Sequence, residues 1–134
     1  MDAQRRQDLW AIVVENYQAA KLTAQRGWHN VSVACCYYGV FTAMWVALGD
    51  PPRRQWSHGG ILQHFSPGQW RQSQTPLDRT ITNTIRSLYN ARLKAQYKAV
   101  RLTATDSAES LTTARQILQL VATALGLPQG GITP

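Results

Sequence analysis

VSVACCYYGVFTAMWVAL, residues 31–48, has the most regular apolar pattern in the chain. Its larger apolar residues recur at steps of three and four, which is the period of a helix that buries one face. The residues on this stripe are Ala34, Tyr37, Tyr38, Phe41, Met44, Trp45 and Leu48. Asn30 is a suitable N-cap for this helix, and Gly49–Pro52 ends it. The segment therefore predicts a long amphipathic helix.

Four further segments are predicted to be helical, and none has the two-residue alternation of a strand. They lie at about residues 3–26, 57–65, 76–98 and 106–125. The fold class is therefore all-α, and the expected architecture is an antiparallel up-and-down four-helix bundle with an additional short helix. Residues 1–128 are expected to form one domain, followed by a disordered Gly- and Pro-rich tail at 129–134.

Two helix starts are marked by capping residues. Thr75 is expected to cap the helix at 76–98, with Pro76 at its first position, where the missing N–H of proline does no harm. Thr105 or Asp106 is expected to cap the last helix, since both side chains can accept a hydrogen bond from the first turn.

The chain carries a net charge of +7, from 14 basic and 7 acidic residues. Such an excess favours polyanionic partners, namely RNA, DNA or an acidic protein. Most of the basic residues are arginines, which suit phosphate recognition and base stacking better than lysines do. They are scattered along the chain, so they do not form a low-complexity basic tail.

The composition also argues against several classes of protein. No segment reaches the unbroken run of about 20 apolar residues that a membrane span needs, and no secretory signal is recognisable, which favours a cytoplasmic protein without a membrane partner. Cys35 and Cys36 are adjacent and are expected to be packing residues rather than a disulfide or a redox pair. Because no Cys/His ligand spacing, paired carboxylates or Gly-rich phosphate loop occurs, we expect no metal and no cofactor.

Arg92 occupies a position where a hydrophobic residue is expected. It continues an apolar stripe on the helix at 76–98, which consists of Leu77, Ile81, Ile85 and Leu88. A guanidinium is rarely buried without a partner, because its desolvation is costly. Arg92 is therefore expected to face a cleft or a second subunit, to extend to water, or to pair with a carboxylate at the edge of the stripe. Together with Tyr97, it is suited to bind a phosphate and stack a base.

Three segments, taken in order, resemble the HEPN family, small helical bundles of prokaryotic defence and toxin–antitoxin systems. Residues 34–44, ACCYYGVFTAM, are similar to its second helix, in which paired tyrosines precede a small residue and Phe. Residues 58–65, HGGILQHF, are similar to its short third helix, which opens with His and closes with Phe. Residues 92–97, RLKAQY, resemble a later motif in which Arg is followed by Ala, Asp and Tyr. The helix order agrees with the family from about Tyr17 to Leu125.

The resemblance implies RNA binding or metal-independent RNA cleavage. Ribonucleases of the family place a His a few residues after the Arg and cleave RNA across a dimer. Here Tyr97 stands where that His is expected, and Gln96 replaces the acidic residue usual before the Tyr. Tyr is a poor base near neutral pH, whereas Arg suits phosphate binding. Binding is therefore favoured over catalysis at Arg92 and Tyr97.

His58 is a third candidate catalytic residue beside Arg92 and Tyr97. It opens the short helix, so it is either a polar group that faces a ligand or a structural hydrogen-bonding residue. Arg53 and His58 also match the bare Arg–His spacing, although they span a loop and a helix start rather than one helix face.

Further candidates for nucleic-acid binding lie near the paired prolines and on the central stripe. Arg53 and Arg54 are placed to contact phosphate if they are not simply solvated, and Trp56 beside them has a ring on which a base could stack. Tyr38 is expected to face a cleft or a partner, because it and its neighbour Tyr37 do not both fit the same core.

Three functions are consistent with these residues. The first is a non-catalytic or weakly catalytic RNA- or nucleotide-binding subunit of an antiviral defence or toxin–antitoxin system. The second is a metal-independent endoribonuclease toxin paired with a nucleotidyltransferase antitoxin. The third is a structural module that binds an acidic protein. The resemblance further implies a homodimer, with a nucleotidyltransferase or a defence-complex protein as a partner.

Overall fold

The computed structural model describes residues 1–134 and consists of helices without a strand, as expected for an all-α chain. The elements are α1 (Ala3–Gln25), α2 (His29–Leu48), α3 (His58–Phe65), α4 (Arg79–Tyr97), α5 (Ala104–Leu125) and the 3-10 helix η1 (Gly130–Ile132). All five predicted helices are present, and their ends lie within about three residues of the predicted ends.

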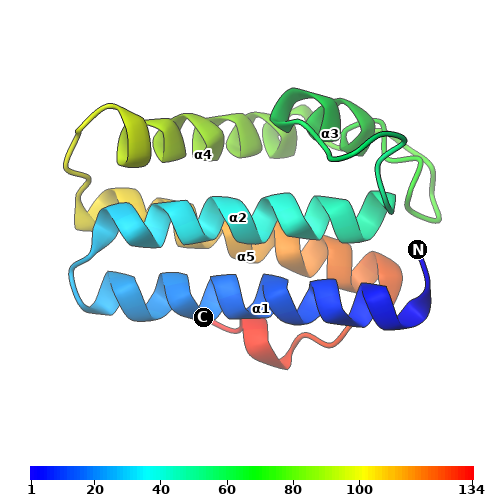
Figure 1. Cartoon of the computed structure of the whole chain (residues 1–134), viewed down its shortest axis with the longest axis horizontal. Helices are drawn as coiled ribbons and strands as arrows, with labels where there is room; N and C mark the ends of the chain where they lie inside the picture. Colours follow the sequence, from blue (N-terminus) through cyan, green and yellow to red (C-terminus); the bar gives the residue numbers. More distant parts are fainter.

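The helix α2 lies at the centre of the molecule. In Figure 1 it runs between α1 and α4, with α5 behind it, and successive long helices run in opposite directions. It contacts all four of the other α-helices. The residues that the sequence places on the most regular stripe thus belong to the helix that organises the fold.

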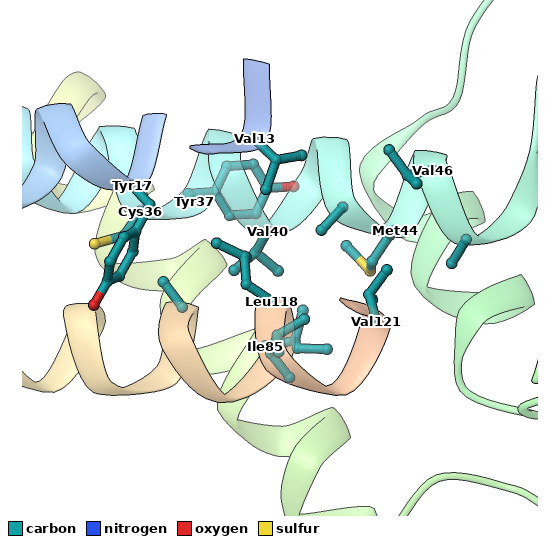
Figure 2. Packing of buried hydrophobic residues seen from close by; sticks show 14 of the residues in the cluster. Val13, Tyr17, Cys36, Tyr37, Val40, Met44, Val46, Ile85, Leu118 and Val121 are labelled. Carbon is teal, nitrogen blue, oxygen red and sulfur yellow. The ribbon is translucent and has the colours of Figure 1, made fainter. Parts of the chain in front are cut away.

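The core fills the space between these helices (Figure 2). Cys36 and Val40 of α2 are buried there with Val13 of α1 and Leu118 of α5. Burial, with a smaller effect of the adjacent Cys35, raises the pKa of the Cys36 thiol to about 12. The thiol therefore stays protonated and serves as a packing group, as predicted.

By length and composition alone, α2 is apolar enough to cross a membrane. In this fold, however, 61% of its most apolar window is buried inside the protein. A helix surrounded by others is apolar on most of its faces. The hydropathy of α2 is therefore explained by its central place in the core.

The predicted N-cap of α2 has a different role. The N-cap residue is Trp28, which makes no side-chain cap bond. Asn30 instead donates from its side-chain nitrogen to the carbonyl oxygens of Ala95 (3.1 Å) and Val100 (2.7 Å). Its side-chain oxygen accepts from the backbone N–H of Leu102 at 2.9 Å. The side chain thus ties α2 to the connection between α4 and α5, and this tertiary role displaces local capping.

The helix α4 begins later than predicted. Its N-cap is Asp78, whose carboxylate accepts from the backbone N–H of Thr80 at 2.7 Å. Pro76 therefore precedes the helix, and Thr75 is not the cap. The Thr75 carbonyl and hydroxyl oxygens accept from the Arg71 guanidinium instead, which holds the chain in the loop before α4.

The helix α5 begins slightly earlier than predicted. Thr103 is the N-cap, and Asp106 is the third helical residue of a capping box in which the two side chains bond to each other's backbone N–H groups. Thr105 has no capping role. The spacing between Thr103 and Asp106 is the signal that identifies the motif in the sequence.

The C-terminal residues 129–134 are ordered, so the expectation of a disordered tail is wrong. They return along α1, which η1 contacts (Figure 1). Ile132 is only 1% exposed, and the Tyr17 hydroxyl donates to the carbonyl oxygen of Thr133 at 3.2 Å. A buried isoleucine and this hydrogen bond offset the entropy lost when a Gly-rich segment becomes ordered.

Candidate functional site

Arg92 lies on the buried face of α4, with only 7% of its surface exposed. Its Nε donates to Oε1 of Gln96, one turn later, at 2.6 Å. Its Nη2 donates to the hydroxyl oxygens of Tyr38 on α2 (3.1 Å) and Tyr97 (3.3 Å). The Tyr38 hydroxyl in turn donates to Oε1 of Gln96 at 3.4 Å. All of the hydrogen-bonding partners of Arg92 are therefore neutral groups.

Three tyrosine rings surround the guanidinium. Its Cζ lies 5.4 Å from the ring centroids of Tyr37 and Tyr38 and 5.2 Å from that of Tyr97. Each contact of this cation–π type contributes about 0.5–2 kcal/mol. The rings thus hold the cation in place without neutralising its charge.

No carboxylate pairs with Arg92, so the predicted alternative of an ion pair is wrong. The one ion pair in the chain joins Arg5 and Asp50, at 2.9 Å. Burial lowers the pKa of the Arg92 guanidinium, but the hydrogen bond to Tyr38 and the neighbouring tyrosines more than offset this effect, and the pKa is raised above its ordinary value. A buried cation with only neutral partners is retained at a cost in folding stability.

Exposed side chains, rather than an open cleft, cover Arg92. It does not line either of the cavities beside α3, which have volumes of about 810 and 400 Å³. The cover is thin, because Tyr97 is 67% exposed and Tyr38 is 37% exposed. Exposed side chains change rotamer within nanoseconds. Tyr97 and Tyr38 are therefore the covering side chains that can move most easily to let an anion reach Arg92.

His58 is connected to Arg92 through Tyr37. The Tyr37 hydroxyl forms a hydrogen bond with Nδ1 of His58, and their ring centroids are 5.3 Å apart. Tyr37 is only 2% exposed and has no other acceptor for its hydroxyl proton, so we assign the donor role in this bond to Tyr37. Its ring contacts the cation and its hydroxyl contacts the imidazole.

Both groups of this hydrogen bond are held in their neutral forms. Burial raises the pKa of Tyr37, and the charge of Arg92 opposes that rise only in part. Burial and, secondly, the charge of Arg92 lower the pKa of His58. Near neutral pH the imidazole is therefore uncharged, with Nδ1 as acceptor and the proton on Nε2.

Six residues thus form one connected group, which we call the tyrosine cluster. Its members are Tyr37, Tyr38, His58, Arg92, Gln96 and Tyr97. Its chemistry is that of an anion site with aromatic walls and a neutral imidazole at one end. No group of three or more His, Cys, Asp or Glu side chains is placed to hold a metal ion.

No protein-family model, curated protein or solved structure matches this chain. The chemistry of the tyrosine cluster therefore carries the functional proposal.

Three of the predicted binding residues lie outside the tyrosine cluster. Arg53 and Arg54 are exposed in the loop after α2. That helix continues for ten residues beyond Tyr38, about 15 Å, before the loop begins. Trp56 is half-buried, and its indole N–H donates to the carbonyl oxygen of Gly49 at 3.0 Å. No hydrogen bond, ion pair or cation–π contact joins any of these three residues to the tyrosine cluster.

Two members of the tyrosine cluster are not among the site residues predicted from the sequence: Tyr37, which was expected to pack in the core, and Gln96. Gln96 lies four residues after Arg92, the spacing at which helical side chains meet. Gln96 also stands where the similar HEPN motif has an acidic residue. The sequence therefore marked this position as unusual. A neutral amide there explains why the cation lacks a counter-ion.

Acid is expected to destabilise the protein through His58. Its pKa is lower in the folded than in the unfolded chain, so the folded chain binds fewer protons and stability rises with pH between the folded-state pKa and about 6.5. The contribution is complete above about pH 6.5 and is lost as the pH falls through the folded-state pKa. Urea unfolding at a series of pH values measures this rise.

The variant His58→Asn keeps a side-chain oxygen that can accept from Tyr37 but removes the titrating group. We expect it to flatten the pH dependence, while the control His64→Asn, on the exposed side of the same helix, keeps the His58 contribution. A His58→Asn protein with the unchanged pH profile would contradict the assignment of a neutral, desolvated imidazole.

Proposed function

We propose that this protein binds RNA through the tyrosine cluster, as a HEPN-like, non-catalytic or weakly catalytic subunit of a prokaryotic defence or toxin–antitoxin system. The observation that carries the proposal is Arg92, a buried cation whose hydrogen-bonding partners are all neutral. The all-helical fold supports the further proposal of a HEPN-type up-and-down four-helix bundle.

Phosphate is the anion that best fits these groups. The planar guanidinium of Arg92 can donate two parallel hydrogen bonds to phosphate oxygens. Tyr38 and Tyr97 expose phenol rings beside it, and such rings stack on unpaired bases. The net charge of +7 attracts a polyanion to the surface before these contacts form. Single-stranded RNA offers phosphates and unstacked bases together.

The neutral imidazole of His58 gives the ribonuclease alternative its support. Metal-independent cleavage needs a base near the 2′-hydroxyl and a cation at the phosphorane, and His58 and Arg92 have those properties. The Tyr37 ring, however, lies against both groups, and Tyr97 replaces the expected His. Binding therefore remains the main proposal, and cleavage by a toxin paired with a nucleotidyltransferase is the second.

A homodimer belongs to the same proposal. Val31 and Val100 are large apolar residues that the single chain leaves exposed, and a second copy would cover them without closing off Tyr38 and Tyr97. In this setting the protein is cytoplasmic and has a nucleotidyltransferase or a defence-complex protein as its further partner. Sedimentation that gives only a 15.0 kDa species at high concentration would contradict the dimer.

A single assay separates binding, cleavage and a purely structural role. Purified protein is incubated in EDTA with a labelled single-stranded RNA, and binding is measured at several salt concentrations. We expect binding that weakens steeply as salt rises, because the RNA releases counter-ions when its phosphates are neutralised, and little or no cleavage. Cleavage that His58→Asn abolishes would favour the ribonuclease. Failure to bind at low salt would contradict the proposal and leave a structural module.

A further inference from the structure

A cavity of about 400 Å³ lies between α2, α3 and α4, beside the tyrosine cluster. Tyr37 and Tyr89 supply aromatic walls, and His58, Arg86 and Asn90 supply polar groups. Pockets for small molecules have volumes of this order and combine apolar walls with a few polar groups that fix the orientation of the ligand. Arg92 does not line this cavity. The proposal of an anion site at Arg92 therefore does not explain the polar groups of the cavity.

The polar groups of the cavity are free to bind a ligand. Arg86 and Asn90 lie one turn apart on α4, and Arg86 has no ion pair. The Asn90 amide presents a donor and an acceptor side by side, which matches one edge of a nucleobase. His58 adds an Nε2–H donor, because its Nδ1 accepts from Tyr37. The wall therefore offers a cation, an amide and an imidazole N–H.

Arg86 also lines a second cavity, of about 810 Å³, between α3 and the start of α4, where Arg79 lies. Gly59 and Leu62 line both cavities, so the two adjoin. Neither has an acidic residue in its wall. Together they form what we call the α3–α4 groove, with an aromatic end next to the tyrosine cluster and a cationic end beyond it.

We propose that the α3–α4 groove binds one nucleotide, with the base against the half-buried ring of Tyr89 and the phosphate at Arg86. Every base has a π-face that packs on tyrosine rings, and a guanidinium fork matches a phosphate. This inference rests on the proposed function, because the nucleotide in the groove is one residue of a bound RNA strand. Because Tyr37 borders both sites, a strand with one base in the groove passes next to Arg92.

Gly59 offers a substitution that fills the groove and leaves the core untouched. A Cβ added there meets no atom within 4 Å, so the side chain of Gly59→Leu extends into the open space. Gly59→Ala makes the same backbone change with little added volume and is the matched control. Arg86→Gln removes the phosphate contact, and Arg26→Gln, at the exposed C-terminal end of α1, removes one charge elsewhere.

Calorimetric titration with AMP, GMP, CMP, UMP and ribose 5-phosphate tests the groove itself. We expect at least one mononucleotide to bind more tightly than ribose 5-phosphate, since only the former has a base to stack. Gly59→Leu and Arg86→Gln should each weaken that binding by roughly tenfold or more, and the two controls should leave it unchanged. Equal binding of ribose 5-phosphate, or no loss in Gly59→Leu, would overturn the inference.

Titration of the same variants with single-stranded RNA separates this inference from the proposed function. RNA binding that Gly59→Leu leaves unchanged would overturn the groove and leave the Arg92 proposal standing. Mononucleotide binding that responds to Gly59→Leu, without any RNA binding, would support the groove as a nucleotide site and contradict the proposed function. If neither ligand binds, both ideas fail.

Discussion

Arg92→Met is expected to weaken RNA binding by at least about tenfold without destabilising the fold. A hydrogen-bonded contact with a charged group contributes about 1.5–3 kcal/mol, and about 1.4 kcal/mol corresponds to a factor of ten. The folded chain, by contrast, loses a buried charge that has no counter-ion. Tyr38, Gln96 and Tyr97 are exposed, so water replaces the hydrogen bonds they made to the guanidinium.

Two measurements on Arg92→Met check this expectation. Fluorescence anisotropy with labelled RNA at several salt concentrations gives the affinity and its salt slope, which should fall in magnitude by about 0.7 for one lost phosphate contact. Urea unfolding gives the stability, which should be equal to or above that of the unchanged protein. Arg26→Met controls for the loss of one positive charge. An affinity equal to that of the control would contradict a phosphate site at Arg92.

Gly68→Ala is expected to cost about 3 kcal/mol or more of folding stability. Gly68 has a φ of +73°, and a Cβ there would lie 1.9 Å from the carbonyl oxygen of Thr75. Since that oxygen belongs to the backbone, the loop between α3 and α4 has to shift to relieve the contact. The same shift should widen the α3–α4 groove, so nucleotide binding should weaken as well. Thermal and urea unfolding measure the stability.

Gly126→Ala is the matched control for this substitution. Gly126 ends α5 with a φ of +68°, but nothing lies within 4 Å of an added Cβ. Gly126→Ala should therefore lower the folding stability only by the strain of an alanine in the left-handed backbone region, about 1–2 kcal/mol. The difference between the two variants isolates the steric contact at Thr75. Equal losses in the two would contradict the close packing of the loop before α4.

The fold class could be read from the sequence because local and tertiary requirements agree along α2. Its stripe at steps of three and four is the pattern that a helix with a buried face needs. Asn30 is a position at which local reasoning failed. Its side chain suits a local cap, yet it donates instead to the carbonyl oxygens of Ala95 and Val100, which are distant in the sequence. Ile132 is similar, since a lone isoleucine in a Gly-rich tail does not reveal the core site that it fills on α1.

The candidate site was found through a broken pattern. Arg92 stood out because a cation interrupts an apolar stripe. The structure buries this guanidinium without an ion pair, an arrangement that the sequence did not predict. The contacts of Tyr37 with Arg92 and with His58 join three helices. Residue spacing within a single helix cannot predict such contacts. Arg86 and Asn90 were missed for a related reason: on α4 alone they look like an ordinary solvated face, and only the packing of α3 turns that face into a groove.

The guanidinium of Arg92 is the atom group on which the whole account depends, and its NMR signal reports on it directly. In the free protein, the Nε–H of Arg92 donates to Gln96 at 2.6 Å, so its proton should exchange slowly enough to be observed. The spectrum of Arg92→Lys assigns the signal by its disappearance. With added single-stranded RNA, we expect this signal to shift in proportion to the bound fraction. RNA that binds to saturation while the Arg92 signal stays in place would contradict the account.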